Sequence, residues 1–273
     1  MLTSGYVTPK LPYGLLGAPQ PIPMVNPQGD FDPRMIAGIG VWFDAADQST
    51  ITLNGSSVSQ WSDKSGNALH ATQDTANNQP AYIPGGRAGR AVVRFDGAND
   101  SLVTASFANG WGEFTSFCVF STIAGVPPGG GIGLQVLWTR STDRQRGIVV
   151  QASSGAVAHG IRGHLNSAGQ TDFDSSLFGL FGRYYYLTNR HDGSTISRAA
   201  AFTCRANGAD IQNTASGSFS VSSVANTVLR IGNRSDGTRG FYGNMCELIV
   251  YAVSLPALQV SLVEEYLARK WGL

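Results

Sequence analysis

From residue 39 onward, short runs that alternate apolar with polar residues are separated by clusters of Gly, Asn, Asp and Ser. Alternation with a period of two is typical of strands with one buried face, and many of these runs are rich in β-branched or aromatic residues. Asp192-Gly193 and Asp236-Gly237 favour tight hairpin turns. The pattern predicts strands at residues 40–45, 58–63, 91–96, 101–107, 114–123, 133–139, 147–153, 183–190, 197–204, 216–222, 227–233 and 243–253. Many short strands at this spacing predict a β-sandwich or a barrel.

The last segment has a helical period and predicts one helix over residues 257–270, approximately. Apolar residues fall at helical spacings on one side: Leu255, Leu258, Leu262, Val263, Tyr266 and Leu267. Glu264, Glu265, Arg269 and Lys270 supply the polar side. We expect this helix to pack on a sheet and to contribute to the core. Pro256 offers no capping side chain at its start.

The first 35 residues have a different composition from the rest of the chain. They are dense in Pro and Gly, which break helices and sheets. Yet they also carry apolar residues such as Tyr6 and Leu16, whose exposure to water costs free energy. This pattern predicts an extended arm at residues 1–35, followed by one domain at residues 36–273. We expect the arm to dock between subunits through Tyr6, Tyr13, Leu15 and Leu16. A strap that packs on its own domain is the alternative.

Composition and charge exclude several classes of protein. The chain of 273 residues is 42% hydrophobic and 14% charged, which suits a large folded core, and its formal net charge of +1 argues against nucleic-acid binding. No apolar run approaches the roughly 18 residues that a membrane span needs, and the N-terminus lacks the pattern of a signal peptide. Cys118, Cys204 and Cys246 have no metal-binding spacing and are expected to be buried thiols.

Three stretches resemble a known family. They are "GVWFDAADQSTITLNGSSVSQWSDKSGNALHATQ" at residues 40–73, "GRAVVRFDGANDSLV" at residues 89–103 and "ELIVYAVSLPALQVSLVEEYLARKWGL" at residues 247–273. Together they resemble the laminin-G-like, concanavalin A-like lectin and glucanase domains, of the type found in virion proteins of tailed bacteriophages. The resemblance implies an all-β fold, a jelly-roll sandwich of two antiparallel sheets. It places Trp42, Trp61, Phe95 and Trp271 in the core, and Asp44, Asp63 and Asp100 in turns.

The carboxylates do not form the pattern that glucanases with this fold use. Those enzymes carry acids two residues apart on one strand, so that both face one glycosidic bond. The chain has four Glu residues, Glu113, Glu247, Glu264 and Glu265, and none has an acid two residues away. The sequence therefore predicts no catalytic residues and a protein that is not an enzyme.

Two weaker signals concern ligands. Asp96, Asn99 and Asp100 could supply oxygen ligands to a structural calcium ion, but Asx and Gly residues also make an ordinary hairpin turn, which the sequence favours. No other cofactor is expected. The Tyr184–Tyr186 triplet and Trp111 could offer aromatic surfaces to a glycan, although a Tyr triplet on a sandwich strand must turn at least one ring into the core.

Together, the family resemblance and the N-terminal arm predict a structural protein of a phage virion, such as a capsid decoration or cement protein. We expect it to be made in the host cytoplasm. Its expected partners are other virion subunits such as the major capsid protein, and copies of itself, with no nucleic acid and no membrane. A carbohydrate-binding adhesion module of a phage fibre or a bacterial surface is the alternative.

Overall fold

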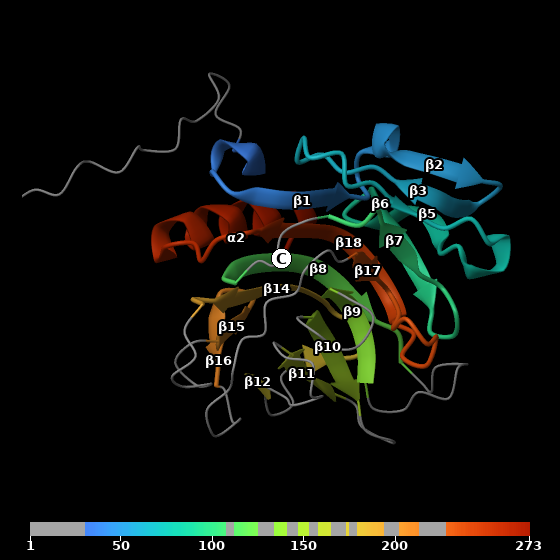
Figure 1. Ribbon diagram of the computed structural model, residues 1–273. Coiled ribbons are helices and arrows are strands. Elements are labelled where there is room, and N and C mark those ends of the chain that lie inside the picture. Colours follow the sequence, from blue (N-terminus) through green and yellow to red (C-terminus); the bar gives the residue numbers. More distant parts are fainter. Residues whose placement is uncertain are drawn as a thin grey trace, which may run out of the picture.

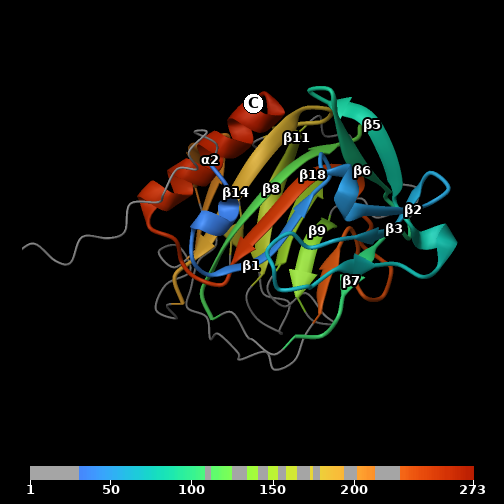
Figure 2. The ribbon, with the colours of Figure 1, turned by 90° about the horizontal axis from the view of Figure 1, so that it is seen from above.

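Strands make up most of the computed structural model, which describes residues 31–107, 112–124, 134–140, 147–152, 158–164, 173–174, 179–193, 202–212 and 228–273. These ranges hold eighteen strands in one antiparallel hydrogen-bonded sheet that folds over on itself into two packed layers. The sandwich predicted from the strand pattern is confirmed. Figures 1 and 2 show the strands with helix α2 (Ala257–Trp271) along one side.

The first layer is built around β18 (Tyr242–Tyr251), which pairs along one edge with β8 (Phe114–Thr122). Its other edge pairs first with β6 (Arg90–Asp96) and then with β1 (Ile39–Asp44). Outward from these lie β5 (Ala81–Arg87) beyond β6, and β14 (Tyr184–His191), β15 (Phe202–Ala206) and β16 (Ala209–Ile211) beyond β8.

The second layer runs in the order β2-β3-β4-β7-β17-β9-β10-β11. Its strands are β2 (Ile51–Asn54), β3 (Ser57–Trp61), β4 (Ala71–Thr72), β7 (Leu102–Thr104), β9 (Leu134–Arg140), β10 (Gly147–Ala152), β11 (Ala158–His164) and β17 (Leu229–Ile231), with β12 (Phe173–Asp174) and β13 (Gly179–Leu180) on β11. One residue pair, Ser57 with Ala81, joins β3 to β5 and so connects the layers. Short 3-10 turns occupy Pro33–Met35, Gln48–Thr50 and Ala76–Asn78.

Strand β18 explains why the core has two parts. Met245, Leu248 and Val250 face the core between the layers, whereas Ile249 and Tyr251 face helix α2. A strand covered on both faces must be apolar throughout, which accounts for its continuous hydrophobic run. The free thiols of Cys118, Cys204 and Cys246 are buried in these cores as expected.

Helix α2 confirms the predicted helix and corrects its predicted apolar face. The buried side consists of Val260, Val263, Glu264, Leu267 and Trp271, whereas Leu258 is 70% exposed. At 3.6 residues per turn, Leu258 lies about 160° from Val260 and therefore points away from the sheet. Pro256 precedes the helix without a side-chain cap, as predicted, and Gly272 ends it in the left-handed conformation.

A buried charge network holds the helix on the first layer. Glu247, with no exposed surface, accepts hydrogen bonds from Trp42 Nε1 (2.8 Å), Tyr266 Oη (2.8 Å) and Trp271 Nε1 (2.7 Å). Lys270 Nζ lies 2.8 Å from Glu247 Oε2 and 2.8 Å from Asp44 Oδ1. Burial raises the pKa of Glu247, and Asp44 raises it further, while Lys270 opposes both. These contacts join strand β1, near the start of the described sequence, to helix α2 at its end.

The described start of the chain packs on its own sandwich. The ring of Phe31 lies 5.7 Å from that of Tyr266, Ile36 is buried beneath α2, and Tyr251 Oη donates to the carbonyl of Pro33 at 2.8 Å. Tyr6, Tyr13, Leu15 and Leu16 lie outside the described residues, so the docking of the arm and the boundary near residue 35 stay predictions.

Candidate functional site

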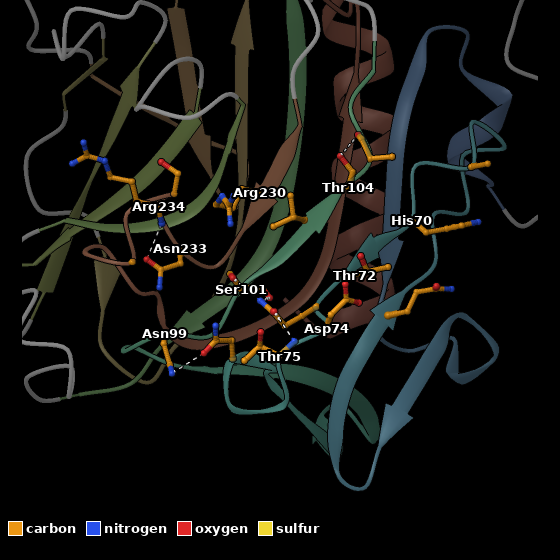
Figure 3. A pocket seen from close by; sticks show the side chains of 18 residues that line it. His70, Thr72, Asp74, Thr75, Asn99, Ser101, Thr104, Arg230, Asn233 and Arg234 are labelled. Carbon is orange, nitrogen blue, oxygen red and sulfur yellow. Dashed lines mark hydrogen bonds between the residues drawn. The ribbon is translucent and has the colours of Figure 1, made fainter.

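A pocket of about 780 Å³ opens on the outer face of the second layer, the face that points away from α2. Strands β3, β4, β7 and β17 form its floor, and the loops at their ends form its walls. Figure 3 shows Arg230 in the middle of the lining side chains, with Asn233 and Arg234 on one side and His70 and Thr72 on the other. Its size lies in the range of small-ligand sites, but most of its lining residues have polar side chains, whereas such sites are usually lined by apolar ones.

Strand register places the floor residues in one row. Gln60 pairs with Thr72, Thr72 with Val103, and Val103 with Arg230. Alternate strand residues share a face, and the intervening residues Leu102 and Ile231 belong to the core between the layers. The row from Gln60 to Arg230 therefore points outward into the pocket.

Side-chain amides fix the walls. Gln73 Nε2 donates to the carbonyl and hydroxyl of Ser101, both at 3.0 Å, and Asn99 Nδ2 donates to Asn78 Oδ1 at 2.9 Å. Asn233, almost fully buried, donates from Nδ2 to the Ala98 carbonyl at 3.1 Å. These bonds tie three loops together, so the pocket is held open by its own polar groups.

Gly232 lets the chain turn from β17 into the wall at Asn233. Its φ is +84°, a conformation that L side chains rarely adopt, and the ring of Phe95 lies where a Cβ atom would be. Close contact with this buried ring leaves room for no side chain. The strand end and the wall therefore meet at a fixed angle.

Several polar groups are available to a ligand. Asp74 and Thr72 are exposed at the pocket, and no hydrogen bond of either side chain to another described residue is found. His70 Nδ1 accepts from the Asp63 N–H at 3.1 Å, so the neutral ring carries its proton on Nε2. Arg230 presents a guanidinium whose pKa is lowered by burial. The site thus offers both donors and acceptors.

The turn next to the pocket shows what the Asp96–Asp100 segment does. Asp96 Oδ1 accepts the Ala98 N–H at 2.8 Å and the Asn99 N–H at 3.3 Å, and Asp100 Oδ2 accepts the Asp96 N–H at 2.9 Å. The favoured interpretation, an ordinary Asx turn, is therefore observed. Within the described ranges, no group of three or more His, Cys, Asp and Glu side chains is placed to hold a metal ion.

We expect the replacement of Asp100 by asparagine to stabilise the protein at pH 7. Burial first, and Asp96 second, raise the pKa of Asp100 to about 6. Because this lies above the ordinary value of about 4, the favourable contribution of the protonated group is fully present below pH 4 and is lost as the pH rises through 6. Asparagine keeps the acceptor for the Asp96 N–H without the charge.

The expected gain in the free energy of unfolding at pH 7 is about 1–2 kcal/mol, since solvent at the rim screens part of the repulsion. The gain should shrink towards zero at pH 4, as measured by urea unfolding at both values. Asp74→Asn, a control at an exposed carboxylate of the same pocket, should change stability by less than about 0.5 kcal/mol. An equal gain at pH 4 and pH 7 would contradict this explanation.

The tyrosine triplet singled out from the sequence does not line this pocket. Tyr186 is buried against α2, which confirms that at least one ring of the triplet is core, and Tyr184 Oη donates to the carbonyl of Gly86 at 3.2 Å. Trp111 lies outside the described residues. Sequence reasoning missed the pocket itself, because Gln60, Thr72 and Arg230 come from separate strands and form no motif.

A second pocket, of about 620 Å³, lies between α2 and strands β14–β16. Its charged lining side chains already have partners: Arg205 lies 2.9 Å from Glu264 and 3.2 Å from Asp210, and Arg190 Nε donates to Ser254 Oγ at 2.8 Å. Burial raises the pKa of Glu264. Because its polar groups bind one another, this pocket offers fewer contacts to a ligand than the first.

Comparisons with known proteins place the fold. No protein-family profile matches the chain, and no curated protein matches it in sequence. Among solved structures, the chain is similar to Trypanosoma rangeli sialidase, with a TM-score of 0.53 and 12% identity over 86% of this chain and 33% of that one. The same sialidase in complex with 2,3-difluorosialic acid gives a TM-score of 0.56 and 13% identity, over 91% and 35%.

The binding domain of Paraclostridial Mosquitocidal Protein 1 is also similar, with a TM-score of 0.51 and 14% identity over 85% of this chain and 52% of that one. The chain thus spans about a third of the sialidases and half of the mosquitocidal domain. At these identities the likeness shows the fold alone. The class defined here is an all-β jelly-roll sandwich of the kind that also occurs in the sialidase chains and in the mosquitocidal binding domain, consistent with the concanavalin A-like fold. The virion part of the resemblance finds no support among these structures.

One expectation from the sequence is corrected by these comparisons. The absence of an acid pair on one strand predicted a protein outside the enzymes, yet the structural relatives include sialidases. The acid-pair rule describes one catalytic arrangement of this fold, so it does not exclude relatives that are enzymes.

No helix within the described ranges is long and apolar enough to span a membrane.

Proposed function

We propose that the protein binds carbohydrate in the pocket on the outer face of the second layer. The observation that carries this proposal is the polar lining: amide, hydroxyl, imidazole and guanidinium groups gathered around a cavity of about 780 Å³. A saccharide presents many hydroxyl groups, each of which both donates and accepts, so it matches a site that offers both. An apolar ligand would leave these groups unsatisfied, which is costly.

The structural relatives support the same proposal at the level of the fold. They include Trypanosoma rangeli sialidase in complex with sialic acid, at 14% identity over 90% of this chain. The described lining residues include no Phe, Trp or Tyr. We therefore expect affinity to come from hydrogen bonds, with weak single-site binding that gains from several copies on one surface.

The experiment is a glycan array followed by calorimetric titration of the best ligand, with two variants that each fill one pocket. Thr72→Trp places an indole on the floor of the first pocket, and Thr203→Trp does the same at an exposed residue of the second. We expect Thr72→Trp to weaken binding at least tenfold and Thr203→Trp to leave it unchanged, with both variants melting like the wild type.

Two outcomes would contradict the proposal. An array on which no glycan binds would remove its basis. Binding that survives Thr72→Trp and is lost in Thr203→Trp would assign the ligand to the pocket beside α2.

A place on a phage particle is the finer part of the proposal. It is supported by the resemblance of residues 40–73 and 247–273 to virion proteins, and by the apolar residues of the arm. In this setting the arm would contact other virion subunits or further copies of the chain through Tyr6, Tyr13, Leu15 and Leu16. The outward pocket would then be displayed many times on one surface.

A further inference from the structure

Arg230 is unusual among the partly buried cations of the described residues. Its neighbours in β17, Leu229 and Ile231, are fully buried in the core, so Arg230 points to the opposite face and into the pocket. Nε of Arg230 is buried without a hydrogen-bond partner, and no ion pair joins its guanidinium to a described carboxylate.

Other partly buried arginines of the described chain have clear partners. Arg205 lies 2.9 Å from Glu264, and Arg190 donates to Ser254 at 2.8 Å. Leaving a buried charged donor unpaired costs free energy, which is recovered when an acceptor arrives. The lowered pKa of Arg230, caused by burial, is the sign of this cost.

We propose that Arg230 receives the acidic group of a saccharide that carries a single negative charge, and that this group is a carboxylate. The inference rests on the proposed carbohydrate binding and names its ligand class. A guanidinium presents parallel N–H donors that match the two oxygens of a carboxylate. Arg234, the other cation of the lining, lies 3.4 Å from Asp236, so Arg230 is left to balance one charge, which disfavours a phosphate group carrying close to two.

The surrounding groups fit a sugar ring attached to that carboxylate. Thr72 lies in the same cross-strand row, two strands from Arg230, and the exposed carboxylate of Asp74 follows it on the wall. The carboxylate of Asp74 can accept hydrogen bonds from sugar hydroxyl groups but repels a second anion. The site therefore selects a saccharide with one acidic group within the pocket over a densely charged polyanion.

The test uses the full chain and pairs of saccharides that differ only in charge. The pairs are 3′-sialyllactose with its methyl ester, and the methyl glycoside of galacturonic acid with its methyl ester, and a sulfated lactose serves as the other monoanion. Binding is measured by calorimetry for the wild type, for Arg230→Gln, for Arg230→Lys and for Arg269→Gln. Arg269 is exposed on α2, on the other layer, and serves as the matched control.

We expect the wild type to bind at least one acid more tightly than its ester, by about tenfold to a hundredfold. Arg230→Gln should abolish this preference, Arg230→Lys should keep part of it because lysine lacks the planar fork, and Arg269→Gln should keep all of it.

The failures of the two proposals are distinguishable. Equal binding of acid and ester that Thr72→Trp still blocks would overturn the carboxylate assignment and keep the carbohydrate pocket. Preference for sulfated lactose over both acids would also overturn the carboxylate, in favour of a sulfate ester. A wild type that binds no member of any pair would count against the acidic ligand, whereas a silent glycan array would remove both proposals.

Discussion

Replacing Lys270 with methionine is expected to lower the free energy of unfolding by about 3–5 kcal/mol. The ammonium group lies 2.8 Å from the carboxylates of both Glu247 and Asp44, which are buried. Its removal leaves Glu247 with three neutral donors and no cation. A buried ion pair need not stabilise more than apolar packing would, but loss of one partner strands the other charge.

The pH dependence separates this mechanism from a loss of packing. Burial already raises the pKa of Glu247, and without Lys270 this pKa rises further. A carboxyl group with a raised pKa becomes protonated, and so neutral, at a higher pH. The difference in the free energy of unfolding between the wild type and Lys270→Met should therefore shrink as the pH falls from 7 to 5. A deficit caused by packing alone would not change with pH.

The matched control is Arg269→Gln, at the neighbouring exposed residue of the same helical turn, which should change stability by less than about 0.5 kcal/mol. Glu247→Gln should cost less in the Lys270→Met background than in the wild type, because the two residues share one interaction. Urea unfolding with an unchanged slope measures the wild type, the three chains that complete this cycle and the Arg269→Gln control. If Lys270→Met lowered the free energy of unfolding by less than about 1 kcal/mol, the network would contribute little to stability.

Replacing Leu267 with alanine is expected to cost about 2–5 kcal/mol, the range for a buried leucine. Leu267 has no exposed surface and packs between α2 and the first layer. Because a domain is stable by only about 5–15 kcal/mol, removal of the whole helix from residue 256 onward should abolish cooperative unfolding.

Leu258 is the control, because it is a leucine in the same helix that is 70% exposed. Leu258→Ala should change the free energy of unfolding by less than about 0.5 kcal/mol. Both variants remove the same atoms, so the difference between them measures burial. Equal costs at the two positions would mean that the helix does not lie on the sheet as described.

Local pattern was sufficient for most strands and for the extent of the helix. Runs such as residues 114–123 and 243–253 are apolar enough for burial on both faces, and the structure places β8 and β18 there. Strand β5 was missed because Pro84, Gly85 and Gly86 interrupt its pattern. A bulge between Ile83 and Arg87 accommodates them.

The face of a helix depends on what it packs against, and the period alone did not decide it. Leu258 and Leu262 lie on one side at helical spacing, yet the sheet covers the side of Val260, Val263 and Leu267. Glu264 was expected on the polar, solvent-facing side of the helix. It is buried instead, because Thr188 donates a hydrogen bond to it and Arg205 forms an ion pair with it from neighbouring strands.

By itself, the sequence determined the mostly β fold, the closing helix and the buried thiols. Only the tertiary structure decided that Glu247, Lys270 and Asp44 form one network, since they come from a strand, a helix and another strand. The pocket was decided in the same way. Gln60, Thr72 and Arg230 are separated by many residues, and only strand pairing brings them into one row. Local chemistry can be read along the chain, but a site assembled by long-range pairing exists only once the layers have formed.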